Sequence, residues 1–450
     1  MRVLRTSNRL PFVTWLGVVS ILLLIYGSGI GRGFVKDDVV WVGANHVSSW
    51  TDAKALMFRT DGFYRPVVGA SFAIDRALYG LQPFGYGVTN FVLLLLATLA
   101  LAFLAVSLGL NATSAVVVAG VWALNFHGVN MAVLWLSGRT ALWLALWSLL
   151  AACAFVRHRP VLASVAATLA MFSKEEAVML PVILAGWAWV IDGQGQRPRT
   201  RLATAVRLTW SSWVGVGLYL FMRAQTGAMT PLNSPSFYRF VSNPLTVLAN
   251  AFEYLDRACT FSALVLVVAC AVSAQRPRWT PTARRIAILG LIWFVGTYAL
   301  TVFLPLRSSL YALTPSVAAA LLTGCLVQDL WARSTSRGRI RLAIAAVLLP
   351  LLLLPVYWTR NTRWTEIAAL SADTFDVVRQ VSQQRPDVDT LVFRDDLSTR
   401  RSFTNTYGTL LPEAVRLAAG RDVTVTENAA EPAKADTVRI VLRGGRVSIE

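Results

Sequence analysis

The sequence is poor in charged residues and in cysteine, and each shortage excludes a class of protein. Only 15% of the 450 residues are charged, whereas about 25% of a typical soluble domain is charged, so a soluble enzyme is disfavoured. The four cysteines lie in or beside apolar segments, without CxxC or Cys/His spacing, which excludes the common metal-site motifs and indicates small core residues. The sequence also lacks a repeat of fixed period, which excludes a solenoid.

Apolar residues dominate instead. They make up 55% of the chain, and the mean hydropathy is +0.55. Apolar runs of roughly 17–25 residues recur over the first 358 positions, each long enough to cross a bilayer. The first run ends in "GSGIGRG" without a small-x-small cleavage pattern, which favours an uncleaved helix over a signal peptide. The runs predict eleven membrane-spanning helices, at residues 11–30, 88–108, 113–127, 139–156, 160–173, 177–191, 207–223, 247–273, 286–304, 309–330 and 340–358.

The formal net charge of +18 is distributed unevenly. Residues 359–450 contain 13 basic and 13 acidic residues, so the whole excess lies among the predicted spans. Successive loops between the predicted spans lie on alternate sides of the membrane. The N-terminal segment and every second loop together carry 17 basic and two acidic residues. This asymmetry follows the positive-inside rule and indicates no nucleic-acid partner. It predicts a cytoplasmic N-terminus and an extracytoplasmic C-terminal part, and the compact, arginine-rich internal loops favour a bacterial inner membrane.

Two domains are predicted. Residues 1–358 form the membrane domain, with a long first outer loop at 31–87. Residues 359–450 form a soluble extracytoplasmic α/β domain: "NTRWTEIAALSADTFDVVRQVSQQ" has helical spacing, "DTLVF" and "DVTVTE" resemble strands, and "TVRIVLRGGRVSIE" indicates a hairpin about Gly444 and Gly445. Because this domain has no catalytic motif, we expect it to dock on or cover the membrane domain.

Ionisable residues gather in the predicted outer turns, where such groups are costly and therefore candidates for function. A single position is compatible with a structural role: Glu253 and Arg257, spaced i, i+4, fit a helix-surface pair, and a long basic side chain can reach the interface from within a span. Five turns nevertheless converge on one membrane level, which predicts an outward-facing polar cavity. The turns carry Asp37, Asp38, Arg65, Asp75 and Arg76; His127 and Arg139; Lys174 and Glu175; Glu253 and Arg257; and Arg307 and Tyr311.

Such a cavity suits group transfer to a hydroxyl. A carboxylate can accept the proton of the hydroxyl as a general base, and cations can hold a phosphate leaving group. A lipid-linked donor would bring its phosphate to this interface. An ion-coupled transporter would use buried carboxylates and cations as well, so residue pattern alone leaves both alternatives open.

Five stretches in fixed order carry a resemblance to a known family. They are "FVKDD" at 34–38, "FYRPVVGASFAIDRALYGLQPFGYGVTN" at 63–90, "FHGVNMAVLWLSGR" at 126–139, "FSKEEAVMLP" at 172–181 and "LRSSLYALTPS" at 306–316. Together they resemble the membrane region of C-type (GT-C) glycosyltransferases, nearest to the protein O-mannosyltransferases and their relatives with tetratricopeptide repeats. The resemblance implies an all-α polytopic GT-C-like fold with the small α/β domain appended.

The resemblance also implies a reaction. A sugar would pass from a polyprenyl-phosphate donor to a hydroxyl of an acceptor protein or glycan on the extracytoplasmic face, with inversion. Asp37 would be the base and Asp38 would orient the acceptor or the loop. Residues matching the family's substrate- and phosphate-binding motifs are Arg307, Lys174, Arg139, Glu175, Tyr311 and Arg65. No cofactor is indicated, although the acidic pair leaves a divalent metal open.

The sequence departs from the family in places that concern the acceptor. Gly87 stands where a histidine is usual, "HGVNMA" replaces "HPVHTE", and the α/β tail replaces the repeats. Two alternatives remain: a transporter or flippase of a lipid-linked sugar would use the same cavity without a base, and a membrane scaffold would pair these charges without a cavity. The enzyme hypothesis predicts Asp37 and Arg307 in one outward cavity that opens laterally to lipid.

Overall fold

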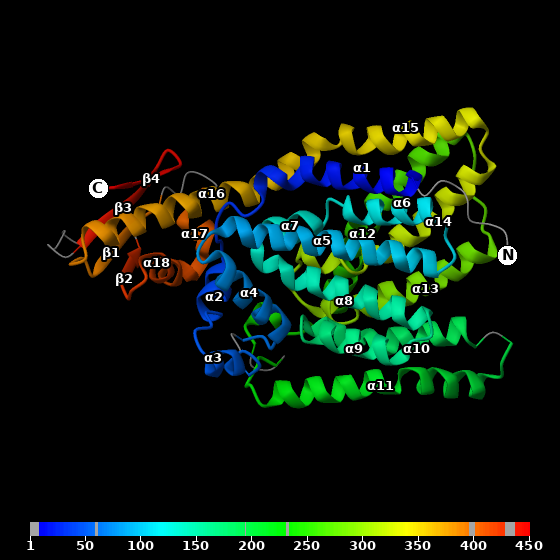
Figure 1. The fold of residues 1–450 in the computed structure, drawn as a ribbon, viewed down its shortest axis with the longest axis horizontal. Coiled ribbons are helices and arrows are strands. Elements are labelled where there is room, and N and C mark those ends of the chain that lie inside the picture. Colours follow the sequence, from blue (N-terminus) through cyan, green and yellow to red (C-terminus); the bar gives the residue numbers. More distant parts are fainter. Residues whose placement is uncertain (1–8, 59–61, 194, 231–233, 396–400, 428–436) are drawn as a thin grey trace.

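Long helices run side by side in the computed structural model, and a small α/β unit lies at one end of them (Figure 1). The structure describes residues 9–58, 62–193, 195–230, 234–395, 401–427 and 437–450. Arg2 and Arg5, which belong to the N-terminal charge prediction, lie outside the described residues.

Each predicted span overlaps a helix. These helices are α1 (Arg9–Tyr26), α5 (Pro83–Ser107), α6 (Ala112–Ala123), α8 (Arg139–Val156), α9 (Pro160–Met171), α10 (Leu180–Ile191), α11 (Pro198–Ala224), α12 (Pro244–Ser273), α13 (Pro281–Tyr298), α14 (Ser316–Arg333) and α15 (Ser336–Leu352). Among the described residues, five helical stretches are long and apolar enough to cross a membrane: Pro11–Gly29, Pro83–Ser107, Leu136–Val156, Pro244–Ser273 and Ser336–Gln384. The chain is therefore an integral membrane protein, while the number of eleven crossings stays a prediction.

Local sequence explains where several helices begin. Proline occupies the first turn of α5, α9, α11, α12 and α13, where its missing N–H is not needed. The side chain of Asn111 accepts a hydrogen bond from the Ser114 N–H at 2.9 Å and caps α6. The Thr280 hydroxyl accepts one from the Ala283 N–H at 3.1 Å and caps α13.

Small residues and tryptophans hold the bundle together. A Cβ placed on Gly324 would lie 2.2 Å from Val118, and one on Gly296 would lie 2.3 Å from Ile183, so glycine lets these helices approach closely. Two buried indole N–H groups donate to backbone carbonyls just before α14: Trp122 to Leu313 and Trp293 to Thr314, each at 2.8 Å. These bonds satisfy polar atoms away from water.

The first outer loop contains short helices: α2 (Asp38–Ala44), α3 (Trp50–Ala55) and α4 (Pro66–Tyr79). A further short helix, α7 (Val129–Leu134), lies between α6 and α8. In Figure 1, α2, α3 and α4 lie at the end of the bundle nearest the α/β unit. The opposite end holds the connection from α14 to α15, where the Arg333 guanidinium donates to the Arg276 carbonyl at 2.7 Å.

The predicted helix, strands and hairpin of the tail are present. The sheet has the order β2-β1-β3-β4, from β1 (Thr390–Arg394), β2 (Thr424–Glu427), β3 (Thr437–Arg443) and β4 (Arg446–Ile449). Strand β1 runs parallel to β2 and β3, and β3 pairs antiparallel with β4. Gly444 and Gly445 both have positive φ, as the tight hairpin turn requires. Helices α17 (Phe403–Tyr407) and α18 (Leu411–Ala419) complete the unit.

The predicted domain boundary after residue 358 falls inside one continuous helix. Helix α16 (Leu354–Gln384) begins beside α1 and α7 and ends in the α/β unit, and Figure 1 shows it linking the two parts. The tail also shares a hydrophobic cluster with the first outer loop, in which Phe34 and Val39 lie with Phe375 and Tyr407. The tail therefore packs onto the outer loop, as a covering module would.

Gly33 tests this contact. A Cβ on Gly33 would lie 2.1 Å from the Ala368 carbonyl oxygen of α16, so Gly33→Ala must push the loop away from the helix. We expect a destabilisation of about 1–3 kcal/mol, as for other overpacked sites, seen as a lower apparent melting temperature in detergent. The matched control is Gly43→Ala in α2, where the nearest atom lies 4.0 Å away; an equal loss in both variants would contradict the close contact.

Candidate functional site

The loop that carries the acidic pair is held from outside the membrane bundle. The Lys36 N–H donates to the Thr406 carbonyl of α17 at 2.8 Å, and the Ser371 hydroxyl of α16 donates to the Phe34 carbonyl at 2.6 Å. Lys36 has φ +51°, a left-handed conformation that a lysine adopts only where its surroundings fix it. Contacts from the tail thus shape the backbone next to Asp37.

Asp38 turns into the protein. One carboxylate oxygen accepts from the Ser137 N–H at 2.6 Å and from the Ser137 hydroxyl, and the other accepts from the Val35 N–H at 2.9 Å. Burial raises the pKa of Asp38 to about 7, although these hydrogen bonds act in the opposite direction. Asp38 thus joins the first outer loop to the turn before α8, and its role in orienting the acceptor or the loop stays a prediction.

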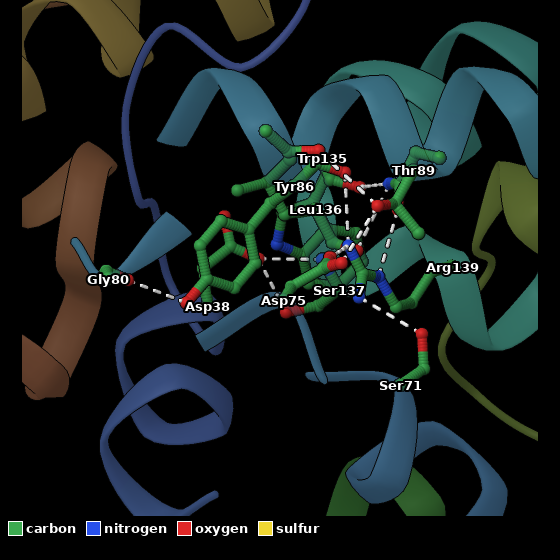
Figure 2. A network of polar contacts seen from close by, with 12 residues as sticks. Asp38, Ser71, Asp75, Gly80, Tyr86, Thr89, Trp135, Leu136, Ser137 and Arg139 are labelled. Atoms are coloured by element: carbon green, nitrogen blue, oxygen red, sulfur yellow. Dashed lines mark hydrogen bonds and ion pairs between the residues drawn. The ribbon is translucent and has the colours of Figure 1, made fainter. Parts of the chain in front are cut away.

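Arg139 is completely buried and forms the centre of the network in Figure 2. Its Nη2 donates to Asp75 at 2.6 Å and to the Tyr86 carbonyl at 3.0 Å, its Nε to Asn90 at 2.9 Å and its Nη1 to Ser71 at 3.1 Å. The sequence predicts that Arg139 binds phosphate, but the structure uses its whole guanidinium to join α4, α5 and α8. Asp75, one of the ionisable residues of the predicted outer loop, is buried as its partner.

A cavity of about 900 Å³ opens beside this network. The structure brings together Asp37 and Arg307, whose sequence positions are far apart, with Arg65, Lys174 and Tyr311 in its lining. Asp38, Arg139 and Glu175 do not line it. Asp37 and Arg307 therefore share one cavity, while the outward direction of this cavity, its lateral opening to lipid and the role of each residue stay predictions.

Asp37 faces this cavity. Its side chain is exposed to the space, and no Lys or Arg side chain of the described residues lies within 4.0 Å of its carboxylate. The surrounding protein raises its pKa above the ordinary value of 3.8 by desolvation, and Arg65 and Lys36 oppose this effect. A carboxylate of raised pKa at a cavity wall is a stronger proton acceptor than a free aspartate.

Carboxylates just outside the cavity neutralise several cations of its lining. Glu175 binds Arg65 through two hydrogen bonds, at 2.7 and 3.0 Å. Burial would raise the pKa of Glu175, but the charges of Arg65 and Lys174 outweigh it and lower this pKa to about 2. Glu176 pairs with Lys174 at 2.8 Å, and the ammonium of Lys174 lies 4.6 Å from the centre of the Tyr311 ring. These pairs hold the cations in place.

Glu253 likewise neutralises cations of the cavity lining. It binds Arg307 at 2.8 Å and also pairs with Arg257, so the predicted i, i+4 pair is one half of a larger cluster. Asn250 accepts a second hydrogen bond from the Nε of Arg307 at 2.7 Å. The Arg307 side chain remains 41% exposed, which leaves it accessible to a ligand.

Sequence reasoning missed the contributions of α16 and of the segment after α11. Arg360, Arg363 and Trp364 of α16 line the cavity, as do Phe237 and Tyr238. The sequence places these α16 residues in a separate soluble domain that begins at residue 359. A signal for the continuous helix exists, because no proline or glycine interrupts the sequence from residue 356 to 384.

Comparison with known proteins relates the fold to two solved membrane transferases. No family model and no curated protein matches the sequence. The oligosaccharyltransferase of Archaeoglobus fulgidus is similar with a TM-score of 0.51 and 12% identity, over 93% of this chain and 64% of that one. The arabinofuranosyltransferase AftD from Mycobacteria is similar with a TM-score of 0.50 and 15% identity, over 86% of this chain and 29% of that one.

These comparisons support the fold. The chain spans less than two thirds of the length of either solved protein, and at such low identity the likeness concerns architecture alone. The predicted fold class, an all-α polytopic membrane protein with a small C-terminal α/β unit, is confirmed, and its architecture is similar to that of the two solved proteins.

The buried position of Arg139 predicts a stability defect on loss of its partner. Asp75→Asn leaves the guanidinium charged, buried and uncompensated, so we expect a destabilisation of about 3–5 kcal/mol and a clearly lower apparent melting temperature. The control is Arg443→Gln, which removes an exposed ion pair with Glu450 and should leave the melting temperature unchanged. Equal behaviour of the two variants would contradict a structural role for the Asp75–Arg139 pair.

Proposed function

We propose that the protein is an integral-membrane glycosyltransferase that moves a sugar from a polyprenyl-phosphate donor to a hydroxyl of an acceptor protein or glycan. The observation that carries the proposal is the shared cavity of Asp37 and Arg307, which unites a proton acceptor with a cation for the leaving group. The fold adds support, since the solved proteins of similar architecture are sugar transferases by name.

Asp37 is proposed as the general base. Its carboxylate accepts the proton of the acceptor hydroxyl as the oxygen attacks the anomeric carbon of the donor. The bond from that carbon to the phosphate oxygen breaks in the same displacement, which inverts the anomeric centre. Asp38 positions Asp37, because it is the next residue and is fixed to Ser137.

Arg307 and Lys174 are proposed to hold the phosphate. Negative charge grows on the phosphate as it leaves, and cations fixed before the reaction stabilise that charge without having to reorganise. Asn250 and Glu253 bind the Nε and Nη1 atoms of Arg307, and no described residue accepts a hydrogen bond from its Nη2. Tyr311 and Arg65 complete the lining beside Lys174, and Glu175 holds Arg65 in position.

The proposed setting follows the charge asymmetry of the sequence. The cavity opens on the extracytoplasmic face of a bacterial inner membrane, with the N-terminus in the cytoplasm and the α/β unit outside. A mannose-type hexose donor is proposed from the family resemblance. The proposal assigns every step to side chains of this chain and to the lipid-linked donor, and it includes no cofactor.

Asp37→Asn tests the base directly. The amide cannot accept the proton, so we expect transfer from radiolabelled polyprenyl-phosphate sugars to fall by about 10²-fold or more while binding of undecaprenyl phosphate persists. Asp376→Asn is the control, since Asp376 lies exposed on α16 outside the cavity lining. Unchanged turnover of the Asp37 variant would refute the base, and transport of a lipid-linked sugar without transfer would favour the flippase alternative.

The raised pKa of Asp37 predicts the pH dependence. A general base works in its deprotonated form, so kcat/KM rises with pH through the pKa of the free enzyme. Because desolvation raises this pKa above 3.8, we expect the acidic limb of the profile above pH 3.8. A profile that stays flat down to pH 3.8 would contradict the assignment.

A further inference from the structure

The cations that line the cavity fall into two groups. Arg65, Lys174, Arg257 and Arg307 each have a carboxylate partner, namely Glu175, Glu176 or Glu253. Lys36, Arg360 and Arg363 also line the cavity, but no carboxylate of the described residues lies within 4.0 Å of their charged atoms. The wall formed by α16 and the first outer loop therefore has an excess of positive charge, because Asp37 is the one carboxylate in the described lining of the cavity.

Helix α16 presents its two arginines together. Arg360 and Arg363 are three residues apart, which places them on neighbouring positions of one helix face. Trp364 stacks on Trp135 of the membrane domain, with ring centres 5.5 Å apart and planes within 11°, and this contact fixes the rotation of the helix. The same face of α16 therefore stays directed toward the cavity.

Arg360 is oriented by neutral groups. Its Nε donates to the Phe126 carbonyl at 3.0 Å, and its Nη2 lies 3.3 Å from Nδ1 of His127. These contacts hold the guanidinium in place without neutralising its charge. His127 therefore helps to position Arg360 beside the cavity. The guanidinium of Arg360 keeps its positive charge and attracts an anion.

Lys36 extends the same wall to the base. It precedes Asp37 in the chain, and the Thr406 carbonyl fixes its backbone. Lys36 and Arg363 line the same cavity. Desolvation and the charge of Arg363 lower the pKa of Lys36, and the neighbouring charge of Asp37 acts in the opposite direction. Three cations that face one carboxylate still repel one another, and a bound anion relieves that repulsion.

We propose that Lys36, Arg360 and Arg363 form a second anion-binding subsite, which takes a phosphate or carboxylate group in addition to the donor phosphate at Arg307. This inference rests on the proposed function, since it counts the donor phosphate as the first anion. Two different molecules could supply this second anionic group. It is either the second phosphate of a diphosphate-linked lipid or an anionic group of the acceptor, placed near Asp37 by Lys36.

The experiment uses the full-length protein in nanodiscs with two lipid probes and one soluble probe. Affinities for undecaprenyl phosphate and undecaprenyl diphosphate are measured for the wild type and for the double variant Arg360→Gln/Arg363→Gln. Binding of inorganic phosphate is then measured on protein saturated with undecaprenyl phosphate. Arg379→Gln is the matched control, because Arg379 lies on α16 but outside the cavity lining.

Two results support the subsite and identify the source. A wild-type preference of about tenfold or more for the diphosphate, lost in the double variant and kept in the control, assigns the subsite to the lipid. Equal lipid affinities, with inorganic phosphate binding that the double variant weakens about tenfold, assign it to an acceptor anion. If the double variant binds both undecaprenyl diphosphate and inorganic phosphate as tightly as the wild type does, the subsite is refuted.

Two further variants keep the outcome unambiguous. Arg363→Gln alone repeats the test if the double variant fails to fold, because Arg363 is exposed. Arg307→Gln tests the proposed donor site separately: it should weaken binding of undecaprenyl phosphate, whereas the double variant should not. If Arg307→Gln leaves this binding unchanged, the donor-site proposal fails while the Arg360/Arg363 result is still decided by the diphosphate and inorganic phosphate measurements.

Discussion

A charge withdrawn from water must be matched by an opposite charge or by hydrogen bonds, and the outer end of this protein is built on that constraint. Arg139 meets it with Asp75 and with polar atoms of α4 and α5. Ser137, two residues before Arg139, binds Asp38, and Asp38 is bonded through the chain to Asp37. Three links, from Arg139 to Ser137, from Ser137 to Asp38 and from Asp38 to Asp37, thus connect the buried ion pair to the carboxylate at the cavity.

The same constraint distinguishes two kinds of cation at the cavity, those paired with a carboxylate and those with neutral neighbours. Where a cation of the cavity is paired, its partner lies just behind the lining, as Glu175 lies behind Arg65 and Glu253 behind Arg307. Where the cation remains open to the cavity, on α16, it has neutral neighbours. The cavity therefore differs in charge from wall to wall, with paired cations on one side and, on α16, cations without a close carboxylate among the described residues.

The sequence predicts local features better than distant partnerships. Apolar run length locates the helices, and two adjacent glycines locate the hairpin turn, because both depend on neighbouring residues. The order of the motifs also predicts that Asp37 and Arg307 line the same cavity. The burial of Arg139 and Asp38 is not predictable from their neighbours, since the partners lie 64 and 99 positions away. The cavity role of α16 was missed because a change of composition near residue 358 suggested a boundary where the helix in fact continues.

Helix α17 has a consequence for how a new chain matures. Lys36 emerges early in synthesis, whereas Thr406, which holds its backbone, is made some 370 residues later. At a synthesis rate of 5–20 residues per second, about 20–70 s pass between the synthesis of Lys36 and that of Thr406. Until α17 has been made and has folded, the backbone beside Asp37 lacks the hydrogen bond from Lys36 to Thr406 that fixes its geometry, so this part of the cavity wall is completed only when the end of the chain is in place.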